Sequence, residues 1–321
     1  MDLRRFIYLH DTGIYKSSKG INMAEEAQDP VINIKSQLEQ HGYAIVPDVL
    51  TRREIDEATD EFHRWRTSVA NLDKLHNLIE TNGIYKFHEV GHQRFAWLLR
   101  TNAKILQVFQ ELWECDELVC SFDGSCYYPV DYECTQSYWT HCDQSCLKKG
   151  LQCYQSFVSL TDNVERTFVV YDGSHKLNDR YNESHPKDEP REFNIIDESY
   201  TETIKDSRRL LRVEAGSLVI WDSRVFHQND CGPHECMEER LVQYLCYLPK
   251  HDERNTTQEQ IKRAEYFRTY RTTPHLPYPI SAVPLQSAYY THYKYDEVYI
   301  DYSRLRDPLL DDLLPKIHPL L

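Results

Sequence analysis

Between residues 115 and 250 the sequence is divided into short apolar stretches, and this division restricts the fold more than any other feature. Five stretches are predicted strands, at residues 118–122, 152–160, 167–171, 217–221 and 240–248. Glycine, aspartate and asparagine separate them, which is typical of short strands joined by turns. No helical segments alternate with these strands, so a parallel α/β architecture is disfavoured.

The segment before residue 115 has a helical pattern instead. We expect a short helix that ends near His41, with Gly42 as its C-cap, and then a buried strand at residues 43–46. Thr51 and Glu54 form a capping-box pattern at the start of a second helix, and apolar residues recur with helical spacing over 101–113. Together these patterns predict a mainly β fold with flanking α: a double-stranded β-helix, or jelly roll, with N-terminal helices packed on one sheet.

The length of 321 residues suits one large domain with extensions. We expect a flexible leader at residues 1–30, followed by one domain at 31–250 that consists of a helical part (31–114) and a jelly-roll core (115–250). Within the core, the polar stretch 178–206 predicts a long surface insertion. Residues 251–321 predict a C-terminal helical and proline-rich extension.

The net charge of −14 limits the partners of the chain. A surface this acidic repels phosphate backbones and anionic membranes, and the sequence contains no long run of lysine and arginine to offset that repulsion. No apolar stretch approaches the roughly 20 residues that a membrane span needs. We therefore expect a small-molecule substrate, no nucleic acid and no membrane; the sequence does not predict an oligomeric state.

The ten cysteines form no Cys-x-x-Cys units. The first residues, MDLRRFIYLHDTG, contain only a short apolar run, too short for the core of a secretory signal. We therefore expect reduced thiols that fill strand faces, and a cytoplasmic location. A zinc cluster is the alternative.

One tripeptide, His141-Cys142-Asp143, has the spacing of a metal-ligand pair. Alternate residues of an extended strand point to the same face, so His141 and Asp143 project together. With a second histidine from another strand they would form the 2-His-1-carboxylate arrangement of iron(II) oxygenases. By itself the tripeptide is weak evidence, because a chain of this composition is expected to contain one by chance, in an exposed loop.

Two other residues, both later in the chain, strengthen this hypothesis. His227 lies just past an apolar strand that begins after Gly216, where a ligand would have fixed geometry; a purely structural histidine is the alternative. Arg240 opens another apolar strand, and a buried arginine needs a partner. A bound dicarboxylate would supply one, and a salt bridge to Glu238 or Glu239 would be the structural alternative.

These residues occur in the order typical of a known family. The chain resembles the phytanoyl-CoA dioxygenase-like family of Fe(II)- and 2-oxoglutarate-dependent oxygenases over most of residues 35–250. The resemblance covers the Gly42-Tyr43 entry, Trp139–Asp143, Gly173-Ser174-His175, the segment Gly216–His227 and Arg240. Two positions depart from the pattern: Asp172 replaces a proline, and Arg240 lies slightly farther than expected from His227.

The resemblance implies a set of roles. Fe(II) would bind His141, Asp143 and His227; 2-oxoglutarate would chelate the iron and pair its distal carboxylate with Arg240; O2 would be the oxidant. The product would be a hydroxylated C–H position, since the carboxylate of Asp143 stands where related halogenases have a small residue. We also expect Trp139, two residues before His141 on the same strand face, to wall the site, with plain core packing as the alternative, and Asn229 to contact 2-oxoglutarate. Residues 271–275 lie outside the resemblance, and we expect them to pack near the mouth.

Three alternatives stay open at this point. The same fold could bind metal without turnover, as a pseudoenzyme. It could be a cupin-like metalloenzyme that uses no 2-oxo acid, in which case no buried cation should face the metal. It could also be a protein-interaction module with an accidental His-x-Asp, in which case His227 should lie far from His141.

Overall fold

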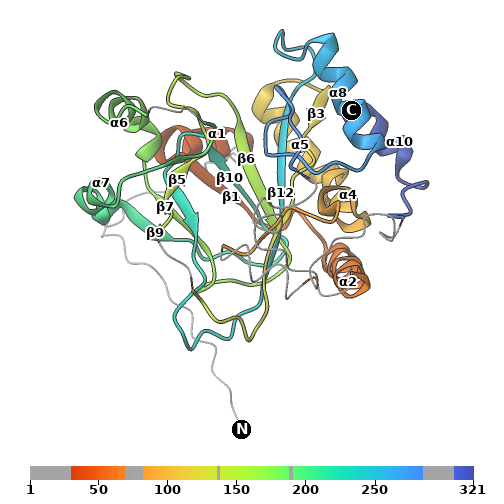
Figure 1. The fold of residues 1–321 in the computed structure, drawn as a ribbon, viewed down its shortest axis with the longest axis horizontal. Helices are drawn as coiled ribbons and strands as arrows, with labels where there is room; N and C mark the ends of the chain where they lie inside the picture. Colours follow the sequence, from red (N-terminus) through yellow and green to blue (C-terminus); the bar gives the residue numbers. More distant parts are fainter. Residues whose placement is uncertain (1–29, 70–71, 73–81, 136–137, 188–190, 285–306) are drawn as a thin grey trace, which may run out of the picture.

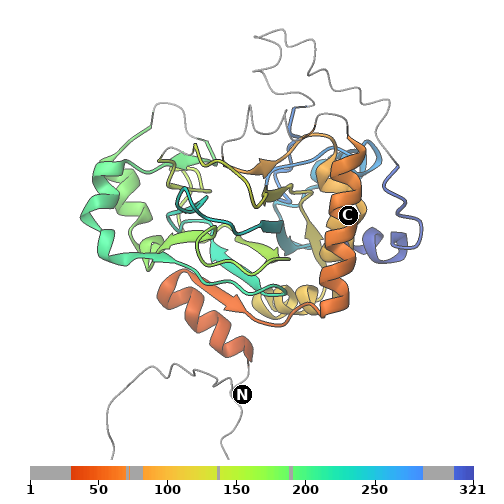
Figure 2. The same cartoon turned by 90° about the horizontal axis from the view of Figure 1, so that it is seen from below.

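The computed structural model describes residues 30–69, 72, 82–135, 138–187, 191–284 and 307–321. Two antiparallel β-sheets form its centre, and helices lie at both ends (Figure 1). The turned view in Figure 2 has the green helices at one end, and the orange and blue helices at the other. The predicted jelly roll is confirmed; the predicted leader lies almost entirely outside the described residues.

The larger sheet has seven antiparallel strands. Their order is β1 (Tyr43–Val46), β10 (Leu218–Asp222), β6 (Tyr154–Ser159), β12 (Arg240–Pro249), β4 (Ser125–Tyr128) and β2 (Ile84–Tyr85), and β3 (Leu118–Cys120) also pairs with β12. The long strand β12 lies inside the sheet, between β6 and β4, and begins at Arg240.

The smaller sheet has five strands, in the order β8 (Asn194–Ile195), β5 (His141–Cys142), β11 (His227–Asn229), β7 (Phe168–Tyr171) and β9 (Arg208–Leu210). The sequence placed His227 beyond the end of a strand, whereas it begins β11. Apolar side chains from the facing strands of both sheets fill the space between them, among them Phe157, Phe168, Val219 and Val242.

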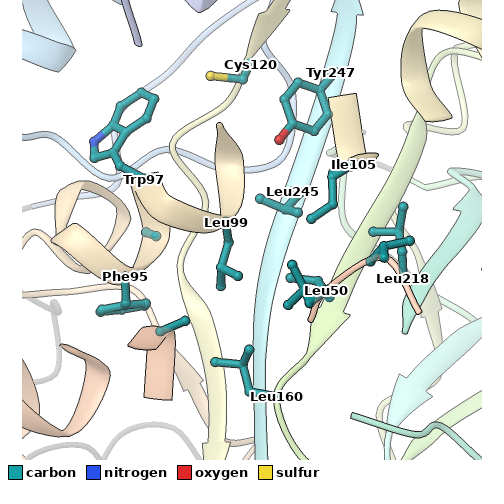
Figure 3. Close-up of a cluster of buried hydrophobic side chains, with 14 of the residues drawn as sticks. Leu50, Phe95, Trp97, Leu99, Ile105, Cys120, Leu160, Leu218, Leu245 and Tyr247 are labelled. Carbon is teal, nitrogen blue, oxygen red and sulfur yellow. The ribbon is translucent and has the colours of Figure 1, made fainter. Parts of the chain in front are cut away.

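Helices cover the outer face of the larger sheet. They are α1 (Pro30–His41), α2 (Arg52–Ser68), α4 (Arg94–Arg100), α5 (Ala103–Trp113) and α8 (Thr257–Arg268). Helix α2 begins as predicted, because Thr51 and Glu54 cap each other's backbone amides, and it buries Ile55, Ala58, Phe62 and Trp65. Figure 3 shows Leu99 of α4 and Ile105 of α5, which pack with Leu245 of β12 in one apolar cluster.

The C-terminal residues join that same cluster. Leu310, Leu313, Ile317 and Leu320 are buried in it, on and beside the short helix α10 (Leu314–Ile317). Their burial against the helical layer removes apolar area from water, so this segment contributes to the stability of the domain. Among the described helices, none is long and apolar enough to cross a membrane.

The predicted surface insertion at 178–206 is wrong in part, because its described residues are largely folded. They contain α6 (Asn178–Ser184), β8 and α7 (Glu198–Thr203). Tyr181 and Ile196 are fully buried, in a cluster with Cys142 of β5. The polar composition misled the prediction, since Asn178, Asn182 and Asn194 are themselves buried and hydrogen-bonded in series.

One pair of cysteines departs from the prediction of reduced thiols. Cys134 and Cys231 form a disulfide that joins the loop after β4 to the loop between β11 and β12. Eight other cysteines are free, and six of those are buried, as expected of thiols that fill strand faces.

Arg166 fixes the same two loops. Its buried guanidinium donates to six backbone carbonyls: Pro129, Val130 and Tyr132 in the first loop, and Cys231, Cys236 and Glu238 in the second. No carboxylate among the described residues pairs with it. The second loop holds the extra residues between His227 and Arg240, so Arg166 sets where β12 begins.

We expect Arg166→Met to lower the free energy of unfolding by about 3 kcal/mol or more, because it strands several buried carbonyls without donors. Chemical denaturation followed by fluorescence measures the change. Arg212→Met is the matched control, since the Arg212 side chain is 75% exposed and should change stability little. Equal stabilities of the two variants would contradict the role assigned to Arg166.

Candidate metal centre

Three side chains predicted from the sequence converge between the sheets. His141 lies in β5, Asp143 directly follows that strand, and His227 begins β11. Strands β5 and β11 pair so that His227 stands opposite His141, which puts both imidazoles on one face. One ligand atom from each residue lies within 4.8 Å of the others. The predicted triad is therefore confirmed as a group that could hold a metal ion.

Backbone carbonyls orient both imidazoles. Nδ1 of His141 lies 2.9 Å from the carbonyl of Trp139, and Nδ1 of His227 lies 2.9 Å from that of Val225. A carbonyl only accepts, so each Nδ1 carries the proton and each Nε2 keeps a lone pair for a metal. Those Nε2 atoms point at Asp143, at 3.6 Å from Oδ1 for His141 and 3.3 Å from Oδ2 for His227.

The electrostatics of the triad suit a divalent cation. Burial and the neighbouring His227 lower the pKa of His141 to about 4, so this imidazole is neutral at pH 7. Burial alone would raise the pKa of Asp143, but His141 and His227 hold the pKa of this carboxyl well below its usual range. Two imidazole nitrogens and one carboxylate form the facial donor set of iron(II) oxygenases, which leaves the remaining coordination positions open.

The triad opens onto a cavity of about 580 Å³. Aromatic and apolar side chains supply much of its surface, alongside polar and charged residues that include Lys86 and Glu192; residues from the C-terminal part, at 273–275, complete its wall. The prediction that residues 271–275 pack near the site is thus confirmed. A largely apolar cavity with a few convergent polar groups is typical of a small-molecule site.

Arg240 has the environment of an anion-binding residue. Its guanidinium is buried between the sheets, where Nη1 donates to Asn229 Oδ1 (2.9 Å) and Cys126 Sγ (3.1 Å), and it lies over the ring of Phe157. Nη2 is buried and has no partner. A buried charge left without an anion is costly, so this atom fits a carboxylate that the structure does not contain.

The structural alternative for Arg240 is wrong. Glu238 accepts backbone amides of residues 164–166 instead, and Glu239 accepts the hydroxyl of Tyr127 at 2.9 Å. Among the residues that the structure describes, none supplies Arg240 with a carboxylate. The cupin-like alternative predicts that no buried cation lies in this region. Arg240 is such a cation, so that prediction fails.

Trp139 and Asn229 both line the cavity; the predicted contact of Asn229 with 2-oxoglutarate stays a prediction. The Trp139 ring stacks on that of His141 at 4.7 Å, and its Nε1 donates to the carbonyl of Asn229 at 3.1 Å. The Asn229 amide accepts from Arg240 and donates to the hydroxyl of Tyr244 at 2.8 Å. Asn229 thus links the metal triad's strand to the arginine.

Two tyrosines near Arg240 were not predicted. Tyr244 follows Arg240 on the same face of β12, a spacing that strand alternation could have revealed. Tyr128 lies opposite Arg240 in β4, and its fully buried hydroxyl has no partner. No sequence signal could have found Tyr128, because its position depends on the pairing register of two strands.

The Gly173-Ser174-His175 turn is structural, as predicted. Ser174 Oγ accepts from the amide of Phe226, the residue before His227, at 2.8 Å. Asp172, which replaces the proline of the family pattern, forms an ion pair with His41 at 2.7 Å. The turn therefore supports the metal-binding strand from behind and supplies no ligand.

Comparison with known proteins agrees with this geometry. A protein-family model described as phytanoyl-CoA dioxygenase (PhyH) matches residues 38–229, more than half of the chain, and ends before Arg240. A curated relative, the "Ava biosynthesis cluster protein O" of Aspergillus versicolor, is 28% identical over 211 residues. That match spans 60% of this chain and 66% of the relative, slightly less than two thirds of its length.

Solved structures support the fold. GlcNAc Inducible Gene 2 from Candida albicans matches with a TM-score of 0.61 and 13% identity, over 90% of this chain and 78% of that one. A "hypothetical protein" from Escherichia coli matches with a TM-score of 0.54 and 12% identity, over 77% and 79% of the two chains. At such identities the likeness extends to the fold alone.

Proposed function

Because the chain belongs to the phytanoyl-CoA dioxygenase family of Fe(II)- and 2-oxoglutarate-dependent oxygenases, we propose that it hydroxylates an unactivated C–H bond of a small organic substrate. One observation carries the proposal: Asn229, which lines the same cavity as the triad His141, Asp143 and His227, accepts from the buried guanidinium of Arg240, whose Nη2 has no partner. An accidental His-x-Asp would not be expected to have both partners in place.

Bound Fe(II) supplies the oxidising chemistry, with O2 as oxidant and with 2-oxoglutarate converted to succinate and carbon dioxide. The chain's own part is to hold and orient these groups. His141, Asp143 and His227 would hold the iron through two Nε2 atoms and one carboxylate. Since Asp143 occupies the position of the acidic ligand, hydroxylation is favoured over halogenation.

Arg240 would bind the distal carboxylate of 2-oxoglutarate. Nη2 is free to donate, and the hydroxyls of Tyr128 and Tyr244 lie in the same polar group, where each can donate to a carboxylate oxygen. Asn229 holds the guanidinium in place through its 2.9 Å hydrogen bond. Arg240 would thus supply the positive charge, and the two tyrosine hydroxyls would supply neutral donors, for one carboxylate of the dianionic co-substrate.

Aromatic side chains would keep water away from the oxidised carbon. Trp139 and Phe193 pack on the ring of His141, at 4.7 Å and 4.4 Å between centroids, and Trp221 and Phe168 pack on His227 at 5.4 Å and 5.1 Å. A dry wall limits side reactions and strengthens the electrostatic interactions inside. A cytoplasmic location remains part of the proposal.

The test is an assay of coupled turnover. Protein loaded with Fe(II) is incubated with 2-oxoglutarate, O2 and a panel of small metabolites, and both succinate and substrate mass are measured. We expect succinate in every mixture at a low rate, and a faster rate with a product 16 Da heavier for the true substrate class. Protein that binds metal and yet forms no succinate under any condition would favour the pseudoenzyme alternative.

A further inference from the structure

Several buried polar atoms in the lining of the cavity, outside the metal triad, lack partners. Asp123 Oδ1 and Gln155 Oε1 are both acceptors without a hydrogen bond, on side chains that are 4% and 2% exposed and that line the cavity. Nε2 of His275, on the same lining, is also unpartnered. Buried acceptors are normally satisfied, so this group points to a missing donor.

The carboxyl of Asp123 is held rigidly. Its other oxygen, Oδ2, accepts from the hydroxyl of Ser121 at 2.8 Å, and its backbone carbonyl accepts from the side chains of Gln243 and Arg100. Ser121 in turn donates its amide to the carbonyl of Cys246 on β12. A side chain fixed this firmly, with one oxygen left over, has the pre-organisation of a binding group.

Gln155 lies at the same height along the strands as Ser121, the residue that holds Asp123. It belongs to β6, where its register partner on β12 is Cys246, the residue that Ser121 contacts. Its amide oxygen and the Asp123 carboxyl therefore approach the cavity from neighbouring positions. A ligand group between them would meet two acceptors, one of them acidic.

Electrostatics favours a positively charged donor. Burial raises the pKa of Asp123 to about 6 against the opposing effects of His275 and the hydrogen bond from Ser121, so a cationic partner would stabilise the ionised carboxylate. A carboxylate ligand would be repelled, and an alcohol could not neutralise the charge. An ammonium group offers several N–H donors and the opposite charge.

We propose that Asp123 and Gln155 form the substrate-recognition site and bind a protonated amine on a substrate with an apolar, ring-containing body. The aromatic lining supplied by Trp139, Phe168 and Phe193 suits such a body. This inference rests on the proposed function, because the amine site shares its cavity with the metal triad.

The test compares probes that differ only in one group. Tryptamine and phenethylamine are the amines, the corresponding alcohols replace nitrogen by hydroxyl, and the corresponding carboxylic acids reverse the charge. Dissociation constants are measured by calorimetry on protein loaded with nickel(II) and 2-oxoglutarate, which prevents turnover. We expect at least one amine to bind about tenfold or more tightly than its alcohol, and the acid to bind most weakly.

Variants then assign the preference to residues. Asp123→Asn keeps the shape of the side chain and should reduce the preference for amine over alcohol to about twofold or less. Gln155→Met removes the second acceptor at similar volume and should weaken amine binding about threefold or more, which tests the site even if Asp123→Asn does not fold. Asp162→Asn is the matched control, since Asp162 is exposed and accepts from the amide of Ala215 away from the cavity.

The outcomes separate the two proposals. Wild-type protein that does not bind 2-oxoglutarate in its nickel form contradicts the oxygenase function. Wild-type protein that binds 2-oxoglutarate but shows no preference for either amine, or prefers the acids, overturns the amine site alone. An amine preference that survives Asp123→Asn, or that is unaffected by Gln155→Met, overturns the assignment to these residues.

Discussion

Substitution of His227 by alanine is expected to reduce succinate formation from 2-oxoglutarate by more than about 100-fold. Loss of a residue that merely orients a metal ligand commonly costs 10- to 100-fold in metal affinity, so loss of a ligand itself should cost at least that. The partly buried Asp143 carboxylate would also lose one of the two imidazoles that now hold its pKa low. Succinate release and iron affinity, measured by competition with a chelator, report the two effects.

His251→Ala is the matched control for this substitution. The side chain of His251 is 73% exposed and pairs with Glu117 on the surface, so its removal should leave both iron affinity and succinate formation unchanged. Folding of both variants is checked by circular dichroism. A folded His227→Ala protein that keeps wild-type iron affinity would exclude His227 as a ligand.

Replacement of Arg240 by methionine is expected to raise the KM for 2-oxoglutarate about 100-fold or more. Truncating one partner of a buried, charge-assisted pair costs about 2–5 kcal/mol, and each 1.4 kcal/mol is a factor of ten. Arg240→Lys should keep the charge and lose the two-pronged geometry, so we expect an intermediate increase of about tenfold. Direct binding of 2-oxoglutarate to the nickel-loaded protein should weaken in the same order.

A surface arginine provides the comparison for Arg240. Arg208→Met removes an ion pair with Asp230 at 3.0 Å whose side chains are partly exposed, and it should leave the KM for 2-oxoglutarate unchanged. If Arg240→Met binds 2-oxoglutarate as tightly as wild type, the distal carboxylate must lie elsewhere, and Tyr128 and Tyr244 would lose their assigned role as well.

The metal triad could be predicted because its signals are local. Strand alternation puts His141 and Asp143 on one side, and an apolar strand followed by a histidine marks His227. What the sequence could not supply is the pairing of β5 with β11, which puts His227 opposite His141. Register between strands that are far apart in sequence depends on the whole sheet, so it had to come from the family resemblance or from the structure.

The remainder of the site was not predictable for a related reason. Asp123 follows a strand and His275 belongs to an irregular segment outside the family match, and neither lies in a motif. Both reach the cavity only because long-range hydrogen bonds fix their loops, such as that from the amide of Phe122 to Thr273 Oγ1 at 2.9 Å. Binding residues on loops carry no periodic pattern that a sequence reading can use.

For residues 178–206 the sequence did carry a signal, but it predicted a surface insertion where the described residues are largely folded. A polar composition is normally a sign of a surface loop, yet here three asparagines satisfy one another and the thiol of Cys142 inside the protein. The two apolar anchors, Tyr181 and Ile196, are too few to produce a periodic pattern. A short segment can therefore be ordered by contacts that its composition conceals.

Anaerobic titration of the protein with Fe(II) and 2-oxoglutarate tests the central claim most directly, because it requires the triad and Arg240 to act on one bound complex. The account predicts a visible metal-to-ligand charge-transfer band that saturates at one equivalent of each, is lost in His227→Ala, and requires far more 2-oxoglutarate in Arg240→Met. A folded wild-type protein that gives no band, or a His227→Ala variant that gives an undiminished one, would contradict it.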